Sequence, residues 1–251
     1  MCLIVFAWRP GHSLPLLVAA NRDEFYARPA RPLAAWSDAP GVYAGRDLQA
    51  GGSWLGVGPG NRFAALTNIR DPGQPVGLRS RGELVAGFLR GQDDVPGALA
   101  RLAGRSGEYA GFNLLLGDGQ HLGYLNAQQA RPELLEPGVY GLSNAQLDTP
   151  WPKLIKAREG LRAQLDAADP HRMMALLADA QVASDGTLPE TGVGLETERL
   201  LSSVFIASPH YGTRASTVLI SDALGHRQLI ERSFGPCGGH LGDVTLTLSP
   251  S

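Results

Sequence analysis

A cysteine stands directly after the start methionine, at the head of the apolar run CLIVFAW. If Met1 is removed, Cys2 carries both a thiol and the free α-amine of the chain. An α-amine titrates near pH ~8, so part of it is a neutral base at neutral pH. It could take the thiol proton directly or through one water, and one residue would then supply nucleophile and general base. The plainer interpretation is that Cys2 packs a strand, because cysteine is among the most buried residue types.

A polar cluster of Asn21, Arg22 and Asp23 ends the second apolar run, LPLLVAAN, and continues beyond it. Buried charges are costly unless they are paired, although charges at a strand end can also be solvated. If residues 3–8 and 15–20 form a hairpin, the cluster lies near the start of the chain. Asp23 could then accept a hydrogen bond from the terminal ammonium, and Arg22 could favour the thiolate.

The helices and strands that must position these residues can be predicted from the spacing of apolar residues along the chain and from the turn residues between them. We expect Asp94 to start the second helix, and Ser80 with Glu83 to form a capping box on the first. Thr149 is expected to cap the third helix, with Pro150 at its first position. We expect strands over 2–8, 14–21, 51–58, 62–69, 111–118, 120–126, 138–144, 200–207, 213–222, 226–234 and 243–249, helices over 80–91, 93–104, 149–168 and 169–181, and a polar loop over 184–197.

Strands and helices therefore come in separate blocks rather than in alternation. Such an order favours an α+β fold with antiparallel sheets. Strands that are apolar on both faces indicate a layered structure with helices outside. Because no repeat or linker interrupts the pattern, we expect a single domain over residues 1–251.

The composition and net charge of the chain argue against some classes of binding partner. The chain has 251 residues, a net charge of −2 and a pI near 6.3, which gives no field to attract nucleic acid. It has no apolar run of the ~20 residues that span a bilayer, and no signal-peptide pattern, so we expect no integral membrane segment. Two cysteines do not make a disulfide framework, and a reducing cytoplasm is the expected compartment.

The histidines do not predict a metal site. None of the six pair at helical i, i+4 spacing, and CGGH at 237–240 is the only close Cys/His pair. One Cys and one His cannot complete a structural zinc site, whereas a haem iron needs only one axial ligand. Cys237, His240 and His210 are therefore possible haem ligands, and hydrolysis by the residues above would need no cofactor.

Several motifs keep a fixed order from Met1 to about Arg232. They are MCLIVF, AANRDEFYARP, GGSWLG, AALTN, RGELV, GFNLLL, YGLSNA followed by TPW, and YGTRAST. Together they resemble the NRDE family, which includes the transport and Golgi organisation 2 (TANGO2) proteins. That family is in turn similar to N-terminal-nucleophile (Ntn) hydrolases of the choloylglycine hydrolase and penicillin V acylase type. The resemblance implies an Ntn-hydrolase-like four-layer αββα sandwich with antiparallel sheets.

The resemblance also implies roles for single residues. Cys2 matches the nucleophile and Asp23 the aspartate that holds its amine. Asn68 matches a residue whose backbone N–H helps form the oxyanion hole, and Asn144 matches the side-chain donor of that hole. Arg214 matches an arginine that supports the nucleophile. Losing one oxyanion donor typically costs ~100- to 1,000-fold in rate, although each asparagine alone could be a turn residue.

One position departs from the acylase pattern. Those enzymes carry an arginine three residues before the aspartate, where this chain has Ala20. Arg22 lies one residue before Asp23 instead, and successive strand residues face opposite sides. In a regular strand the two cannot both point at the thiol, so Arg22 either reaches the site from a bulge or serves another ligand.

Two hypotheses of function follow. The first is a cysteine hydrolase acting on an amide or acyl bond of a small substrate, with substrate contacts from Asn21, Arg22, Trp54 and Phe112, and Trp36 as a further pocket wall. The second is a haem or acyl-lipid binding and trafficking protein that retains the fold without catalysis, since eukaryotic relatives are associated with haem and lipid handling. The expected partner is a small amide, acyl or haem-like ligand.

Overall fold

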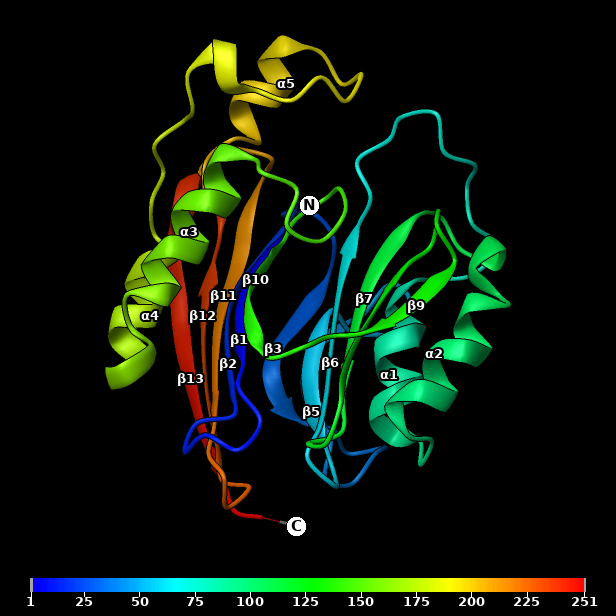
Figure 1. Ribbon diagram of the computed structural model, residues 1–251. Helices are drawn as coiled ribbons and strands as arrows, with labels where there is room; N and C mark the ends of the chain where they lie inside the picture. Colours follow the sequence, from blue (N-terminus) through cyan, green and yellow to red (C-terminus); the bar gives the residue numbers. More distant parts are fainter. Residues whose placement is uncertain (1, 251) are drawn as a thin grey trace. The chain divides into compact units, whose positions relative to one another are not determined.

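The computed structural model describes residues 2–250, and the described chain divides into two compact units. The first unit comprises residues up to 27, 70–72 and 137–249, and the second comprises 28–69 and 73–136. Each unit contains one antiparallel sheet with helices (Figure 1). The α+β class with antiparallel sheets is therefore confirmed, and a single domain over 1–251 stays a prediction.

The first unit is built on a six-stranded sheet with the order β10-β1-β2-β11-β12-β13. The predicted hairpin at the start of the chain is confirmed, because β1 pairs antiparallel with β2. Both strands lie inside the sheet, which explains why their sequences are apolar on both faces. The strands are β1 (Cys2–Trp8), β2 (Leu16–Phe25), β10 (Gly138–Leu142), β11 (Tyr211–Ser221), β12 (Arg227–Phe234) and β13 (His240–Leu248).

Three helices belong to this unit: α3 (Pro152–Arg162), α4 (Pro170–Leu176) and α5 (Leu195–Leu200). The side of β1 that carries Leu3 and Val5 packs against α3 and α4 in one hydrophobic core. The approach is close at Gly141 of β10, where a Cβ atom would lie 2.5 Å from a methyl carbon of Leu154. Further members of this core are Ala7, Leu17, Ala19, Ala157, Leu161, Met173 and Val218.

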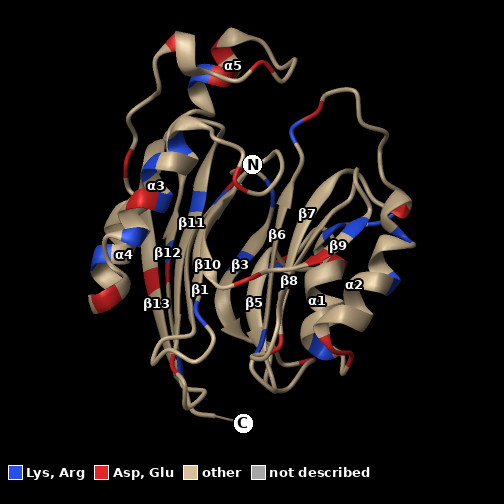
Figure 2. Ribbon diagram, in the orientation of Figure 1, with Lys and Arg blue, Asp and Glu red and all other residues tan. Residues whose placement is uncertain are grey.

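The second unit is a seven-stranded sheet whose order follows the chain, from β3 to β9. Its hydrophobic core joins one face of the sheet to α1 (Gly82–Arg90) and α2 (Val95–Ala103). Most strand positions are uncharged, although Lys, Arg, Asp and Glu also occur on strands such as β2 and β12 (Figure 2). The strands are β3 (Ala30–Ala35), β4 (Tyr43–Asp47), β5 (Leu55–Gly58), β6 (Arg62–Asn68), β7 (Phe112–Gly117), β8 (Leu122–Asn126) and β9 (Arg131–Leu134).

Some local predictions were wrong. No strand forms over 200–207, because α5 ends at Leu200 and turns follow. The apolar side chains of this segment are buried without the segment joining a β-sheet. The backbone N–H of Phe205 donates to the carbonyl of Asp179 and not to a neighbouring strand. Strands β3, β4 and β9 were missed because none of them shows the apolar run or the alternation of a strand. β3 and β9 are largely exposed and each contains a proline, and β4 has five residues, two of them charged.

The helix starts were predicted with mixed success. Asp94 caps α2, since its side chain accepts a hydrogen bond from the N–H of Gly97 at 2.8 Å. The capping box on α1 is wrong: the carboxylate of Glu83 pairs with Arg79 rather than turning back to the helix start. The cap at Thr149 is also wrong, because α3 begins at Pro152.

Within residues 2–250, no helix is both long and apolar enough to cross a membrane.

Candidate active site

Cys2 is the first residue of β1, and Arg22 of β2 lies directly opposite it. Opposite residues of an antiparallel pair project to the same face, so Cys2 and Arg22 share the face that does not carry Leu3. Arg22 is only 8% exposed, and its guanidinium lies 4.0 Å from the carboxylate of Glu24. The β1–β2 register runs without a bulge. Arg22 therefore lies on the same side of the sheet as the thiol, and the β1–β2 pairing contains no bulge that would bring it there.

Asp23 lies on the opposite, helix-covered face of β2 and is 2% exposed. The hydroxyl of Thr213 donates to its Oδ1 at 2.7 Å, and the hydroxyl of Tyr211 donates to its backbone carbonyl at 3.2 Å. Burial raises the pKa of Asp23, while the charges of Lys153 and Arg70 and the Thr213 hydrogen bond oppose that rise. The ionisation of this buried carboxyl group thus depends on its neighbours.

The thiol of Cys2 is a weak acid in this setting. Burial raises its pKa, and the nearby carboxylate of Asp23 adds to the rise. Arg22 and the backbone N–H of Asp23 act in the opposite direction. A thiol with a raised pKa is largely protonated at neutral pH, so it would need a base to become a nucleophile.

The end of β10 lies next to the start of β1. The hydroxyl of Ser143 is 3.0 Å from the carbonyl oxygen of Cys2 and 3.2 Å from Oδ1 of Asn144. Asn144 is 1% exposed, and its carbonyl accepts a hydrogen bond from the N–H of Arg70 at 2.7 Å. The structure therefore places Asn144 near the backbone of Cys2, and its role as an oxyanion donor stays a prediction.

Two buried cations beside this site were missed by sequence reasoning. Lys153 is the second residue of α3 and 3% exposed, and burial lowers its pKa to about 8 although Asp23 opposes the shift. Arg70 pairs with Glu198, and its guanidinium stacks on the ring of Trp151 at 4.5 Å. A signal for the lysine exists, because positions 153, 157 and 161 are the buried side of α3.

Asn21 has a different environment from the one predicted. Its amide nitrogen donates to the carbonyls of Leu177 at 2.9 Å and Val204 at 2.8 Å, and its oxygen accepts from Ser216 at 2.6 Å. The side chain is 1% exposed. Its polar atoms are thus used inside the first unit, and we leave Asn21 out of the proposed substrate contacts.

Arg214 occupies a β-bulge, where the pairing of β11 with β2 shifts between Thr213 and Ala215. Its Nη1 donates to the carbonyl of Phe25 at 3.2 Å, two residues beyond Asp23 on β2. The bulge turns the guanidinium toward the end of β2. Its support of the nucleophile stays a prediction.

Three predicted site residues belong to the second unit. Asn68 is the last residue of β6 and is partly buried. Trp54 is partly buried, with its ring against Gly45, where a Cβ atom would lie 2.2 Å from the ring. Phe112 is wholly buried in the core between sheet and helices, so we leave it out of the proposed substrate contacts. Trp36 is also in that core, and its indole N–H donates to the carbonyl of Ala44.

The possible haem ligands lie on the surface. His210 and Cys237 are exposed, and His240 pairs with Asp243 at 2.7 Å. Both cysteines are free thiols. No group of three or more His, Cys, Asp or Glu side chains within residues 2–250 is arranged to hold a metal ion.

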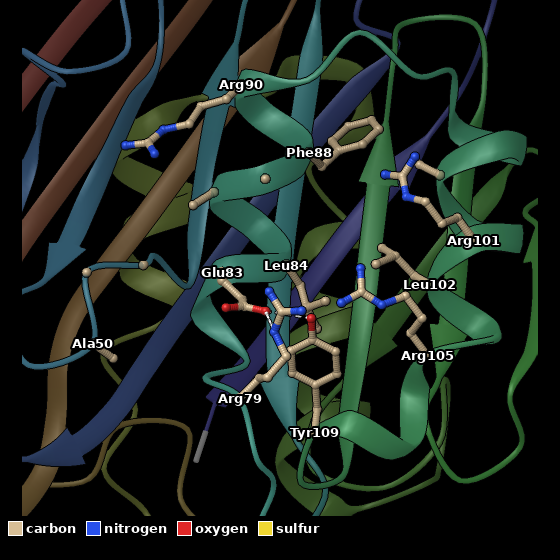
Figure 3. A pocket seen from close by; sticks show the side chains of 15 residues that line it. Ala50, Arg79, Glu83, Leu84, Phe88, Arg90, Arg101, Leu102, Arg105 and Tyr109 are labelled. Carbon is tan, nitrogen blue, oxygen red and sulfur yellow. Dashed lines mark hydrogen bonds and ion pairs between the residues drawn. The ribbon is translucent and has the colours of Figure 1, made fainter.

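The second unit contains a pocket of about 420 Å³ on its helices (Figure 3). Arg79 pairs with both Glu83 and Glu108, and Arg105 pairs with Glu108. The described residues that line it include no cysteine, serine or threonine, so we do not assign hydrolysis by a thiol or hydroxyl nucleophile to it. Its labelled side chains are Ala50, Arg79, Glu83, Leu84, Phe88, Arg90, Arg101, Leu102, Arg105 and Tyr109.

The fold defines the class of protein. A Caenorhabditis elegans N-acylethanolamine-hydrolyzing acid amidase ortholog, an Ntn hydrolase, has a similar structure with a TM-score of 0.52. The match covers 87% of this chain and 92% of that one at 11% sequence identity, so it establishes the fold alone. The chain has an Ntn-hydrolase-like fold.

The sequence defines the family. The chain belongs to the Transport and Golgi organisation 2 (TANGO2) family, whose model matches residues 1–236. It is 39% identical to the Bos taurus homolog and 36% identical to the Homo sapiens homolog, with 93% of each chain covered. It is 27% identical to the Drosophila melanogaster protein. The family predicted from the motifs is confirmed.

Proposed function

We propose that this chain is a cytoplasmic Ntn-type cysteine hydrolase, in which Cys2 attacks an amide or acyl bond of a small substrate. The observation that carries the proposal is the register of β1 and β2, which puts Cys2 opposite Arg22 and within hydrogen-bond reach of the N–H of Asp23. The mechanism requires removal of Met1, which lies outside the described residues 2–250. The fold and the family both support this function.

In the proposed reaction the free α-amine takes the proton of the Cys2 thiol, and the sulfur forms a bond to the carbonyl carbon. Collapse of the tetrahedral intermediate breaks the bond to the leaving group, which receives the proton. Water then hydrolyses the thioester and frees the thiol. Asp23 holds the ammonium, the amide of Asn144 stabilises the oxyanion, and Arg214 supports the nucleophile.

The raised pKa of the thiol supports this role for a base. A resting thiolate would need no proton acceptor, whereas burial keeps the sulfur of Cys2 protonated. An amine on the same residue is the nearest base that the chain can supply after processing. No metal or other cofactor takes part in these steps.

A β-lactone reagent tests the proposal, because a nucleophilic thiol opens it to a stable thioester that adds the full mass of the reagent. We expect intact-mass spectra to show loss of Met1 and a single adduct in the wild type and in Cys237→Ser, and no adduct in Cys2→Ala. An adduct that persists in Cys2→Ala, or a protein that keeps Met1 quantitatively, contradicts the mechanism.

The competing function is a carrier of haem or acyl lipids, and the same variants separate the two. Titration with haemin, followed by its Soret absorbance, should show no saturable binding if hydrolysis is the function. Tight haemin binding that survives Cys2→Ala, together with no β-lactone adduct, would favour the carrier.

A further inference from the structure

The pocket of the second unit lies beside α1 and α2 and has a mixed lining (Figure 3). Arg79, Arg101 and Arg105 line it together with the apolar side chains of Leu84 and Leu102. Its volume of about 420 Å³ lies within the range of small-molecule sites in proteins. A pocket that combines guanidinium groups with apolar walls fits a ligand that has an anionic group and an apolar body.

Two of these arginines approach the pocket from α2, and the third approaches from the side of α1. Arg101 stands in the last turn of α2, and Arg105 follows four residues later, so both leave the same side of this helix end. Figure 3 shows both side chains extending toward α1, with Arg79 beside Glu83 across from them. An anion between the two helices therefore meets guanidinium groups from two directions.

Ion pairs hold these guanidinium groups without using all of their donors. Glu108 accepts from Nε and Nη2 of Arg105, at 2.9 and 2.8 Å, and from Nη1 of Arg79 at 3.2 Å. Arg101 donates to Asp93 through Nη1. A guanidinium carries five N–H donors. Within the part of the chain that the structure describes, no group accepts from Nη1 of Arg105 or from Nε and Nη2 of Arg101, so these N–H groups remain for a ligand.

The arginines around the pocket outnumber their carboxylate partners. Arg90 also lines the pocket, and it shares Asp38 with Arg46. One positive charge is in excess in this cluster, which favours an anionic ligand over a neutral one. The described ion pairs of the cluster join five guanidinium groups to four carboxylates, namely Arg46, Arg79, Arg90, Arg101 and Arg105 with Asp38, Glu83, Asp93 and Glu108.

Gly87 keeps one wall of this pocket open. It lies inside α1, is exposed, and lines the pocket. A Cβ atom at this position would have no atom within 4 Å, and the backbone is that of an ordinary helix, so neither close packing nor conformation requires a glycine. Glycine is a poor helix former. Its presence lowers the stability of α1 and leaves room in the pocket.

We propose that this pocket binds a phosphate monoester with an apolar body, a function distinct from the proposed hydrolysis. None of the described residues that line it is assigned to that reaction. A phosphate monoester carries three terminal oxygens, which match guanidinium groups on two sides better than the two oxygens of a carboxylate. Arg101 and Arg105 bind the phosphate, and the body of the ligand lies against Leu84 and Leu102 beside Gly87.

Isothermal titration calorimetry with naphthyl phosphate tests the site, and naphthoate serves as the carboxylate with the same apolar body. We expect saturable one-to-one binding of naphthyl phosphate to the wild type and clearly weaker binding of naphthoate. The double variant Arg101→Gln/Arg105→Gln should lower the affinity for naphthyl phosphate by ~10-fold or more, because it loses hydrogen bonds from charged donors. No saturable binding to the wild type, an unchanged affinity in the double variant, or equal affinity for naphthoate overturns the proposal.

Gly87→Gln tests the same pocket without changing an arginine. Its side chain occupies the pocket and should weaken binding as much as the loss of the two arginines does. Glutamine is a better helix former than glycine, so this variant decides the matter even if the arginine variant folds poorly. Arg131→Gln removes an exposed arginine from β9 of the same unit and should keep the wild-type affinity. Binding that is unchanged in Gly87→Gln, or that falls equally in Arg131→Gln, overturns the assignment to this pocket.

Discussion

Lys153 should make the protein more stable as the pH rises through an alkaline window. Its folded-state pKa of about 8 lies below the ordinary value of 10.5. Between these two values the unfolded chain binds more protons than the folded one, so the free energy of unfolding rises with pH. The contribution is on the order of 2 kcal/mol, because one pKa unit corresponds to ~1.4 kcal/mol.

Urea unfolding at pH 7.5 and 9.5 checks this slope by comparing the wild type with Lys153→Met. Cys2 and Tyr211 have raised pKa values and act in the opposite direction, so the difference between the two proteins isolates the lysine. Equal changes in unfolding free energy between the two pH values would contradict the prediction.

Single residues were predictable from the sequence when their position was itself unusual. Cys2 is the second residue of the sequence, and Asp23 extends an apolar strand, so both were candidates for chemistry. Lys153 and Arg70 were missed because a lone cation in a helix or loop is ordinarily on the surface. The helical period of positions 153, 157 and 161 indicates the burial of Lys153, whereas only tertiary packing shows that Arg70 is buried. Phe112 was misjudged for the converse reason, since a core aromatic and a pocket wall have the same sequence pattern.

The hydrogen bonds of Asn21 tie β2 to two irregular segments, after α4 and after α5. Replacing Asn21 by Ala leaves two buried carbonyls and the hydroxyl of Ser216 without this partner. We expect Asn21→Ala to lower the free energy of unfolding by about 3 kcal/mol, because each unsatisfied buried group costs ~1–3 kcal/mol. Gln129→Ala, at an exposed site, should change it by less than ~0.5 kcal/mol.

Denaturant titrations of both variants measure the two values. A loss in Asn21→Ala no larger than that in Gln129→Ala would show that these hydrogen bonds contribute little. The result would also reopen a binding role for Asn21.

Element boundaries were predictable where the local chemistry decides them. Asp94 caps α2 because its carboxylate satisfies an N–H of the first turn, a contact that needs no other part of the chain. Glu83 does not cap α1, because its carboxylate contacts Arg79, which lies just before the helix, and accepts a hydrogen bond from Tyr109, which is distant in sequence. The apolar segment after Leu200 is buried without a strand partner, which no period can reveal.

The two compact units are not separate lengths of chain. The first includes both the start of the chain and residues 137–249, and the segment 70–72 interrupts the second. Because the chain passes between units several times, unfolding one releases ends that the other constrains. The single-domain prediction therefore implies one cooperative unfolding transition.

Tryptophans allow the units to be followed separately. Trp8 and Trp151 belong to the first unit, and Trp36 and Trp54 to the second. In each double Trp→Phe variant, the fluorescence midpoint in urea should coincide with the midpoint by circular dichroism. Two midpoints that differ beyond error in either variant would show that the units unfold independently.

The class of fold and the family were both accessible from the sequence, because motifs spread over most of the chain keep their order. Arg70 and Glu198, which pair beside the first unit's site, were not accessible from the sequence. They lie 128 residues apart in the chain and meet only when it folds.

The positions of the first and last strands of the chain also decide where an affinity tag can be attached. β1 is an inner strand that begins at Cys2, whereas β13 is an edge strand with much of its surface exposed. An affinity tag ahead of β1 would prevent the α-amine at Cys2 that the proposed mechanism requires, and it would lie between two neighbouring strands. A tag fused after β13 would extend from a rim that already faces water, and it leaves the thiol and amine available for labelling.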